Sequence, residues 1–104
     1  MGDDVLKTEF ILKYKHDGEH AFYRFLLTYA LNKLILIENE TYRGISPNLE
    51  FLEYSERLIF LYRKEGDDIC LQVSRLFRKA AHKIYRVMLK KNMTDINSKF
   101  LNLV

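Results

Sequence analysis

The chain contains little proline and glycine, with one Pro and four Gly among its 104 residues. Turn-rich β proteins use both residue types repeatedly, whereas helical proteins need them mainly at the ends of elements. Tryptophan is absent, but seven Phe and seven Tyr supply large side chains for a core. The scarcity of Pro and Gly therefore favours an all-α fold, and the length predicts a single helical domain over residues 1–104.

Cysteine occurs once, at Cys70, so an intrachain disulfide is excluded and a reducing compartment fits best. The first four residues are acidic or uncharged, where a secretory signal peptide would be basic. The longest apolar-rich stretch, residues 22–37, is interrupted by two cations and is too short to span a bilayer. We therefore expect an intracellular protein, cytoplasmic or nuclear, with no transmembrane segment.

Apolar periodicity and capping residues predict four main helices and a short C-terminal one that begins near residue 94. The main helices are expected at residues 3–15, 19–38, 47–64 and 67–91. The link between the last two is short, which makes them an antiparallel hairpin. Helix 19–38 is apolar nearly all round, a pattern typical of a central helix. The prediction is a compact antiparallel bundle with helix 19–38 at its centre.

Two stretches leave a second fold open. Phe10, Leu12 and Tyr14 occupy alternate positions, which is also a strand pattern. Residues 34–37 form a short apolar run that a strand can use as well. If both were strands, near 9–15 and 34–38, the chain would be a small α+β protein.

Residues 67–91 show the clearest helical pattern in the chain. Asp67 follows Gly66 and is a suitable N-cap. At about 100° per residue, apolar side chains such as Val73 and Phe77 gather on one side, and basic side chains gather on or beside the opposite side. We call this basic set the basic stripe: Arg75, Arg78, Lys79, His82, Arg86 and Lys90.

Charge is distributed unevenly along the chain. Residues 1–68 carry 13 acids and 9 bases, a net charge of −4, whereas residues 69–104 carry one acid and 8 bases, a net charge of +7. No acidic residue lies between Asp68 and Asp95, so the stripe has no carboxylate of its own helix to pair with. Such asymmetry indicates either contact with an anionic partner or neutralisation of one half by the other on folding.

A second apolar group lies beside the basic stripe on the same helix. We call it the apolar flank, and it consists of Leu71, Tyr85 and Leu89. An apolar strip rimmed by Arg and Lys is typical of a groove for an acidic amphipathic partner, although a neighbouring helix can also cover such a strip. We therefore expect an acidic protein or peptide to bind the basic stripe and the apolar flank.

Nucleic acid is the alternative partner for the same face. A basic helix can follow phosphates, and Tyr85 can stack on a base. The stripe contains no Asn or Gln to read base edges, so phosphate contacts would dominate. The apolar helix 19–38 or the C-terminal helix can in addition form a homo-oligomer interface.

The sequence shows no catalytic pattern, since it has neither a Gly-rich phosphate loop nor a nucleophile elbow. We expect no enzymatic activity, no metal site and no cofactor. The predicted function is a non-catalytic helical interaction module, an adaptor or a complex subunit, that binds an acidic partner.

Overall fold

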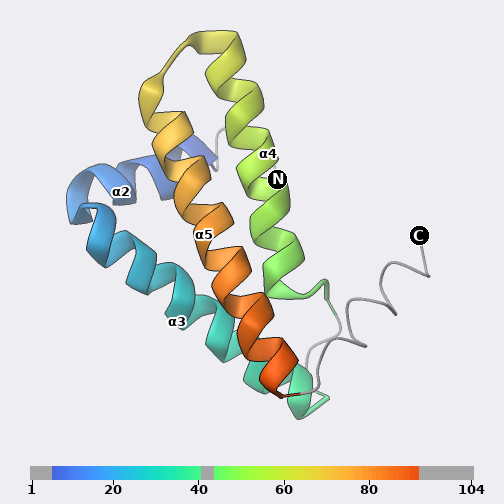
Figure 1. Ribbon diagram of the computed structural model, residues 1–104. Helices are drawn as coiled ribbons and strands as arrows, with labels where there is room; N and C mark the ends of the chain where they lie inside the picture. Colours follow the sequence, from blue (N-terminus) through green and yellow to red (C-terminus); the bar gives the residue numbers. More distant parts are fainter. Residues whose placement is uncertain (1–5, 41–43, 92–104) are drawn as a thin grey trace.

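The computed structural model describes residues 6–40 and 44–91, and within these ranges the regular structure is entirely helical (Figure 1). A π-helical segment, η1 (Leu6–Ile11), continues into α2 (Leu12–Asp17). Three longer helices follow: α3 (Glu19–Glu38), α4 (Pro47–Glu65) and α5 (Asp68–Lys90). The all-α prediction is confirmed. The short C-terminal helix predicted from about residue 94 lies outside the described residues.

The predicted helix boundaries follow from local signals that the structure reproduces. Pro47 occupies the first turn of α4, where its missing N–H costs nothing. Asp67 caps α5, and its Oδ1 accepts a hydrogen bond from the Ile69 backbone N–H at 3.0 Å. Gly66 ends α4 with φ of 74°, a left-handed conformation that a residue without Cβ adopts readily. This corner makes α4 and α5 the antiparallel hairpin that the sequence predicts.

Successive long helices alternate in direction, so α3 and α5 point the same way and α4 runs against both (Figure 1). The C-terminal ends of α3 and α5 are joined by an ion pair, in which Lys91 Nζ lies 3.0 Å from Glu38 Oε1. The described helices share one continuous hydrophobic core. Its largest fully buried side chains include three phenylalanines, Phe22, Phe51 and Phe77, one from each long helix.

The strand alternative for residues 9–15 is wrong, because these residues lie in η1 and α2. In a strand, Phe10, Leu12 and Tyr14 would share one face. In the structure Phe10 and Tyr14 pack against the core together with the buried Ile11, whereas Leu12 is 53% exposed. The buried side chains therefore follow the helical spacing, and the apparent alternation is incidental.

The strand alternative for residues 34–38 is wrong as well, because they form the last turn of α3. Leu34 is buried, whereas Ile35 and Leu36 are both exposed. A strand would place Leu34 and Leu36 on the same face. Helical hydrogen bonds continue to the end of the segment, where the Asn39 backbone N–H donates to the Ile35 carbonyl at 3.1 Å.

The central helix is α5, which corrects the prediction that helix 19–38 would be central. Nine residues of α5 are buried, against four in α3. The helix packs against α3, α4 and η1, and Phe77 at its middle meets aromatic rings from all three. The outer side of α3 is largely exposed, and the contact that reaches it from α2 is the cation–π contact of Lys13 Nζ with the Phe25 ring at 4.6 Å.

Candidate partner-binding face of α5

The basic stripe lies on the side of α5 that is turned away from the core. Val73, Phe77 and Ile84 anchor the opposite side with relative exposures of 1% or less. All six side chains of the stripe are exposed, as the sequence predicts: Arg75, Arg78, Lys79, His82, Arg86 and Lys90. Burial of the apolar side therefore orients the cations outward along the length of one rigid helix.

The ion pairs of the described residues do not include the cations of the stripe. Among the described residues, no carboxylate lies within ion-pair distance of any stripe residue. Three described Lys or Arg ion pairs stay within residues 1–68, and the pair between Lys91 and Glu38 is the one that crosses to the basic half. In the described ranges, the stripe thus keeps its charge available to an external anion.

One edge of the stripe contacts α3 through an aromatic ring. Lys79 Nζ lies 4.7 Å from the centroid of the Tyr23 ring, which is cation–π geometry. The Tyr14 hydroxyl of α2 also reaches α5, where it donates to Gln72 Oε1 at 2.7 Å. Sequence periodicity gave no reason to connect Tyr23 with Lys79, because the contact depends on how α3 crosses α5.

The other edge of the stripe borders a hollow between α4 and α5. The hollow has a volume of about 440 Å³, and its lining consists of Glu56, Ile59, Phe60, Arg63 and Arg78. Phe60 is 63% exposed, the highest value among the large hydrophobic side chains of the described residues. The two guanidinium groups and one carboxylate give the lining a net positive charge. An apolar side chain flanked by carboxylates has the chemistry to fit such a lining.

This hollow was not predicted from the sequence, although α4 carries a signal for it. Phe60 lies about 200° around the helix from the buried Leu58, on the side opposite the core, which marks it as an exposed aromatic residue. Arg63 lies three residues further on, on nearly the same side. The sequence alone does not show that these two residues lie beside Arg78 of the next helix.

The apolar flank is divided rather than continuous. Tyr85 and Leu89 are 42% and 47% exposed and lie one turn apart, so they form a patch near the C-terminal end of α5. Leu71 is only partly exposed and lies fourteen residues before Tyr85, about 21 Å along the helix axis. Arg78 and His82 lie between them. The flank is thus two separate apolar spots beside the stripe, which corrects the single patch that the sequence predicted.

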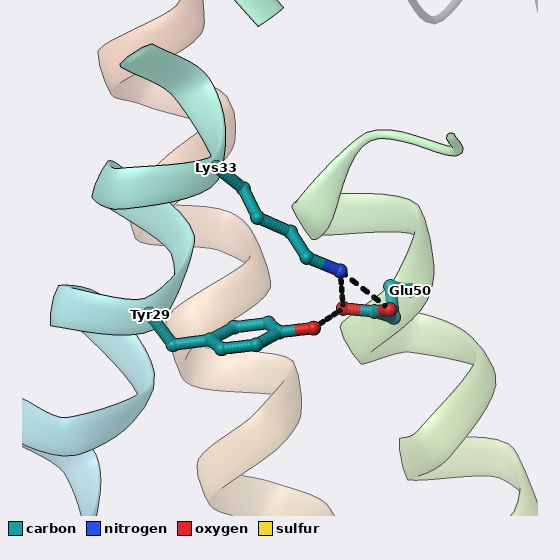
Figure 2. A network of polar contacts seen from close by, with 3 residues as sticks. All are labelled: Tyr29, Lys33 and Glu50. Carbon is teal, nitrogen blue, oxygen red and sulfur yellow. Dashed lines mark hydrogen bonds and ion pairs between the residues drawn. The ribbon is translucent and has the colours of Figure 1, made fainter. Parts of the chain in front are cut away.

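A polar network ties α3 to α4 and stands apart from the stripe (Figure 2). Tyr29 and Lys33 of α3 converge on Glu50 of α4, with the Tyr29 hydroxyl donating to Oε1 at 2.7 Å and Lys33 Nζ lying 3.0 Å from Oε2. Burial is the largest effect that raises the pKa of Tyr29 above its ordinary value. The network involves no stripe residue, so we assign it to the stability of the bundle.

No family model, curated protein or solved structure matches this chain. Within the described residues, no helix combines the length and apolar character needed to cross a membrane. The same part of the chain holds no group of three His, Cys, Asp or Glu side chains arranged to bind a metal ion. Inference about function therefore rests on the geometry of the α5 face.

Proposed function

We propose that this protein is a non-catalytic helical interaction module that binds an acidic partner protein or peptide on the exposed face of α5. The binding surface combines the basic stripe with the hollow beside Phe60 and the apolar spots at Leu71, Tyr85 and Leu89. The cations attract and orient the acidic partner, while the apolar groups bury its hydrophobic side chains. We expect the module to act in the cytoplasm or nucleus, since its one cysteine, Cys70, is buried and has no second cysteine in the chain with which to form a disulfide.

The observation that carries this proposal is that the exposed basic stripe lacks ion pairs to described carboxylates and lies next to exposed aromatic side chains. Like charges in the basic stripe repel one another, which lowers the stability of the chain by itself. Binding of an anion relieves this repulsion. Aromatic side chains such as Phe60 and Tyr85 lose little conformational freedom on binding and are enriched in interfaces. The two features together favour a protein partner over a surface that is merely solvated.

Fluorescence anisotropy with a labelled synthetic peptide tests the proposal. The probe is an acidic amphipathic helix with Leu at i, i+3 and i+7 and Glu elsewhere, compared with a scrambled sequence of the same composition. Reversing Arg75 and Arg86 to Glu should weaken binding at least tenfold, which corresponds to about 1.4 kcal/mol. The matched control reverses Lys15 and Lys64, which are exposed on α2 and α4, so the net charge changes equally.

Apolar variants separate the contribution of packing from that of charge. Phe60→Ala and Leu89→Ala should each weaken peptide binding several-fold, because each removes an exposed apolar anchor without altering charge. Equal binding of the designed and scrambled peptides would contradict the proposal, as would equal losses from the stripe reversal and its charge-matched control.

Nucleic acid is the second candidate for this face, and the exposure of Tyr85 beside the stripe is the observation that favours it. Binding of a labelled oligonucleotide should then fall log-linearly with salt concentration. Replacing Lys90 with Ala should reduce that slope by about one. Tight oligonucleotide binding that depends on Arg75 and Arg86, with no binding of the acidic peptide, would replace the first proposal by this one.

A further inference from the structure

The outer side of α3 is an apolar surface that the described part of the bundle leaves largely exposed, with Lys13 of α2 covering part of it through a cation–π contact to Phe25. Its exposed side chains between Arg24 and Glu38 carry no charge. They are Phe25, Thr28, Leu31, Asn32, Ile35 and Leu36. The four large apolar members are between 36% and 51% exposed. Contiguous exposed apolar surface of this kind is a feature of interaction sites.

The charged residues that bound this surface are placed symmetrically. Arg24 precedes Leu31 by seven residues, and Glu38 follows it by seven. Seven residues are close to two helical turns, so the three side chains lie nearly in line along α3. All three are exposed, and the Glu38 side chain keeps 42% of its surface exposed although it also pairs with Lys91.

We propose that a second copy of this chain packs on the outer side of α3, with the two α3 helices antiparallel about Leu31. In that arrangement Arg24 of each copy lies level with Glu38 of the other, and the uncharged side chains between them are buried. A parallel arrangement would instead oppose Arg24 to Arg24 and Glu38 to Glu38. Charge complementarity therefore selects a second copy as the occupant and sets the direction of packing.

This inference is independent of the function proposed for α5. The outer side of α3 faces away from the core, whereas α5 lies on the core side of α3. Pairing through α3 consequently leaves the basic stripe uncovered, and the dimer carries two stripes. A dimer of this kind would bind a partner with two acidic segments more tightly than the single chain does.

Sedimentation velocity on the full chain, from micromolar to millimolar concentration, provides the first test. We expect a concentration-dependent dimer that Ile35→Asp abolishes, because the new carboxylate would be buried at the interface. Phe60→Asp is the matched control, since it places the same charge at an exposed apolar site on α4. A chain that stays monomeric throughout overturns the proposal and assigns the surface to a different occupant. A dimer that survives Ile35→Asp also overturns it.

A charge exchange tests the direction of packing and does not depend on the apolar variant. Arg24→Glu alone and Glu38→Arg alone should each weaken the dimer, because each opposes like charges across the interface. An equimolar mixture of the two variants should restore dimerisation, since a carboxylate of one variant then meets a guanidinium of the other at both ends of the interface. Circular dichroism checks that both variants remain folded. If the mixture associates no better than the separate variants, the antiparallel arrangement is wrong.

Discussion

The hydroxyl oxygens of Ser55 and Ser74 lie 2.8 Å apart in the buried interface between α4 and α5. Ser74 Oγ also donates to the Ser55 backbone carbonyl, again at 2.8 Å. Because a serine hydroxyl has one hydrogen, Ser55 must be the donor in the contact between the two hydroxyls. Each hydroxyl is therefore satisfied by the other residue, inside an interface where both side chains are almost fully buried.

Replacing one serine of this pair should lower the free energy of unfolding by more than the small size of the side chain suggests. Ser74→Ala removes the acceptor of the Ser55 hydroxyl and should lower the free energy of unfolding by about 1–3 kcal/mol. In the double variant Ser55→Ala with Ser74→Ala, no buried hydroxyl of the pair is left unsatisfied, so the loss should be smaller than the sum of the single losses. Urea unfolding measures all three variants. Strictly additive losses would contradict this reading of the contact.

The network around Glu50 makes a prediction about the α3–α4 pairing. Glu50 is 16% exposed in its side chain, and it accepts hydrogen bonds from Tyr29 and Lys33. Glu50→Ala should lower the free energy of unfolding by about 2 kcal/mol, because it removes a partly buried ion pair with Lys33 and the hydrogen bond from the Tyr29 hydroxyl. Tyr29→Phe removes one of them and should cost about 1 kcal/mol.

The matched control for Glu50 is Glu53 on the same helix. Glu53 pairs with Arg57 in an i,i+4 contact, and its side chain is 52% exposed. Glu53→Ala should therefore cost at most about 0.5 kcal/mol. Chemical denaturation compares the two alanine variants directly. Equal losses would show that burial of the Glu50 network adds nothing to stability.

Alkaline pH should destabilise the bundle through Tyr54. Burial raises the pKa of Tyr54 to about 12 from an ordinary value of 10.0. The unfolded chain loses the phenol proton at lower pH than the native chain does, so the contribution to stability is complete below pH 10 and is lost as pH rises to about 12. We expect the urea midpoint to fall across this window.

Tyr54→Phe should flatten this pH dependence, because the variant has no phenol to ionise at that position. Tyr85→Phe removes a hydroxyl from an exposed tyrosine and controls for the loss of a tyrosine as such. Tyrosinate absorbance, recorded during the same titration, reports when the phenols ionise. A Tyr54→Phe variant whose midpoint falls as steeply as that of the unmodified chain would refute the assignment.

The central parts of the helices and their capping residues were predictable because both depend on neighbours in sequence. Pro47, Gly66 and Asp67 set the ends of α4 and α5 through their own backbone and side-chain chemistry. The two short strand patterns led to a wrong alternative fold, and the cause was again local in sequence. A stretch of about five to seven residues is too short to separate a period of two from one of 3.6 when its partners are unknown.

The faces of α5 were determined by the sequence alone, because side-chain spacing on a helix assigns each residue to a side before any neighbour is known. Which sides meet another helix was decided only by the tertiary structure. It made α5 central, left Ile35 and its neighbours on α3 uncovered, and brought Phe60 beside Arg78 across a hollow. These outcomes depend on how three helices share one core, and periodicity along a single helix carries no information about that arrangement.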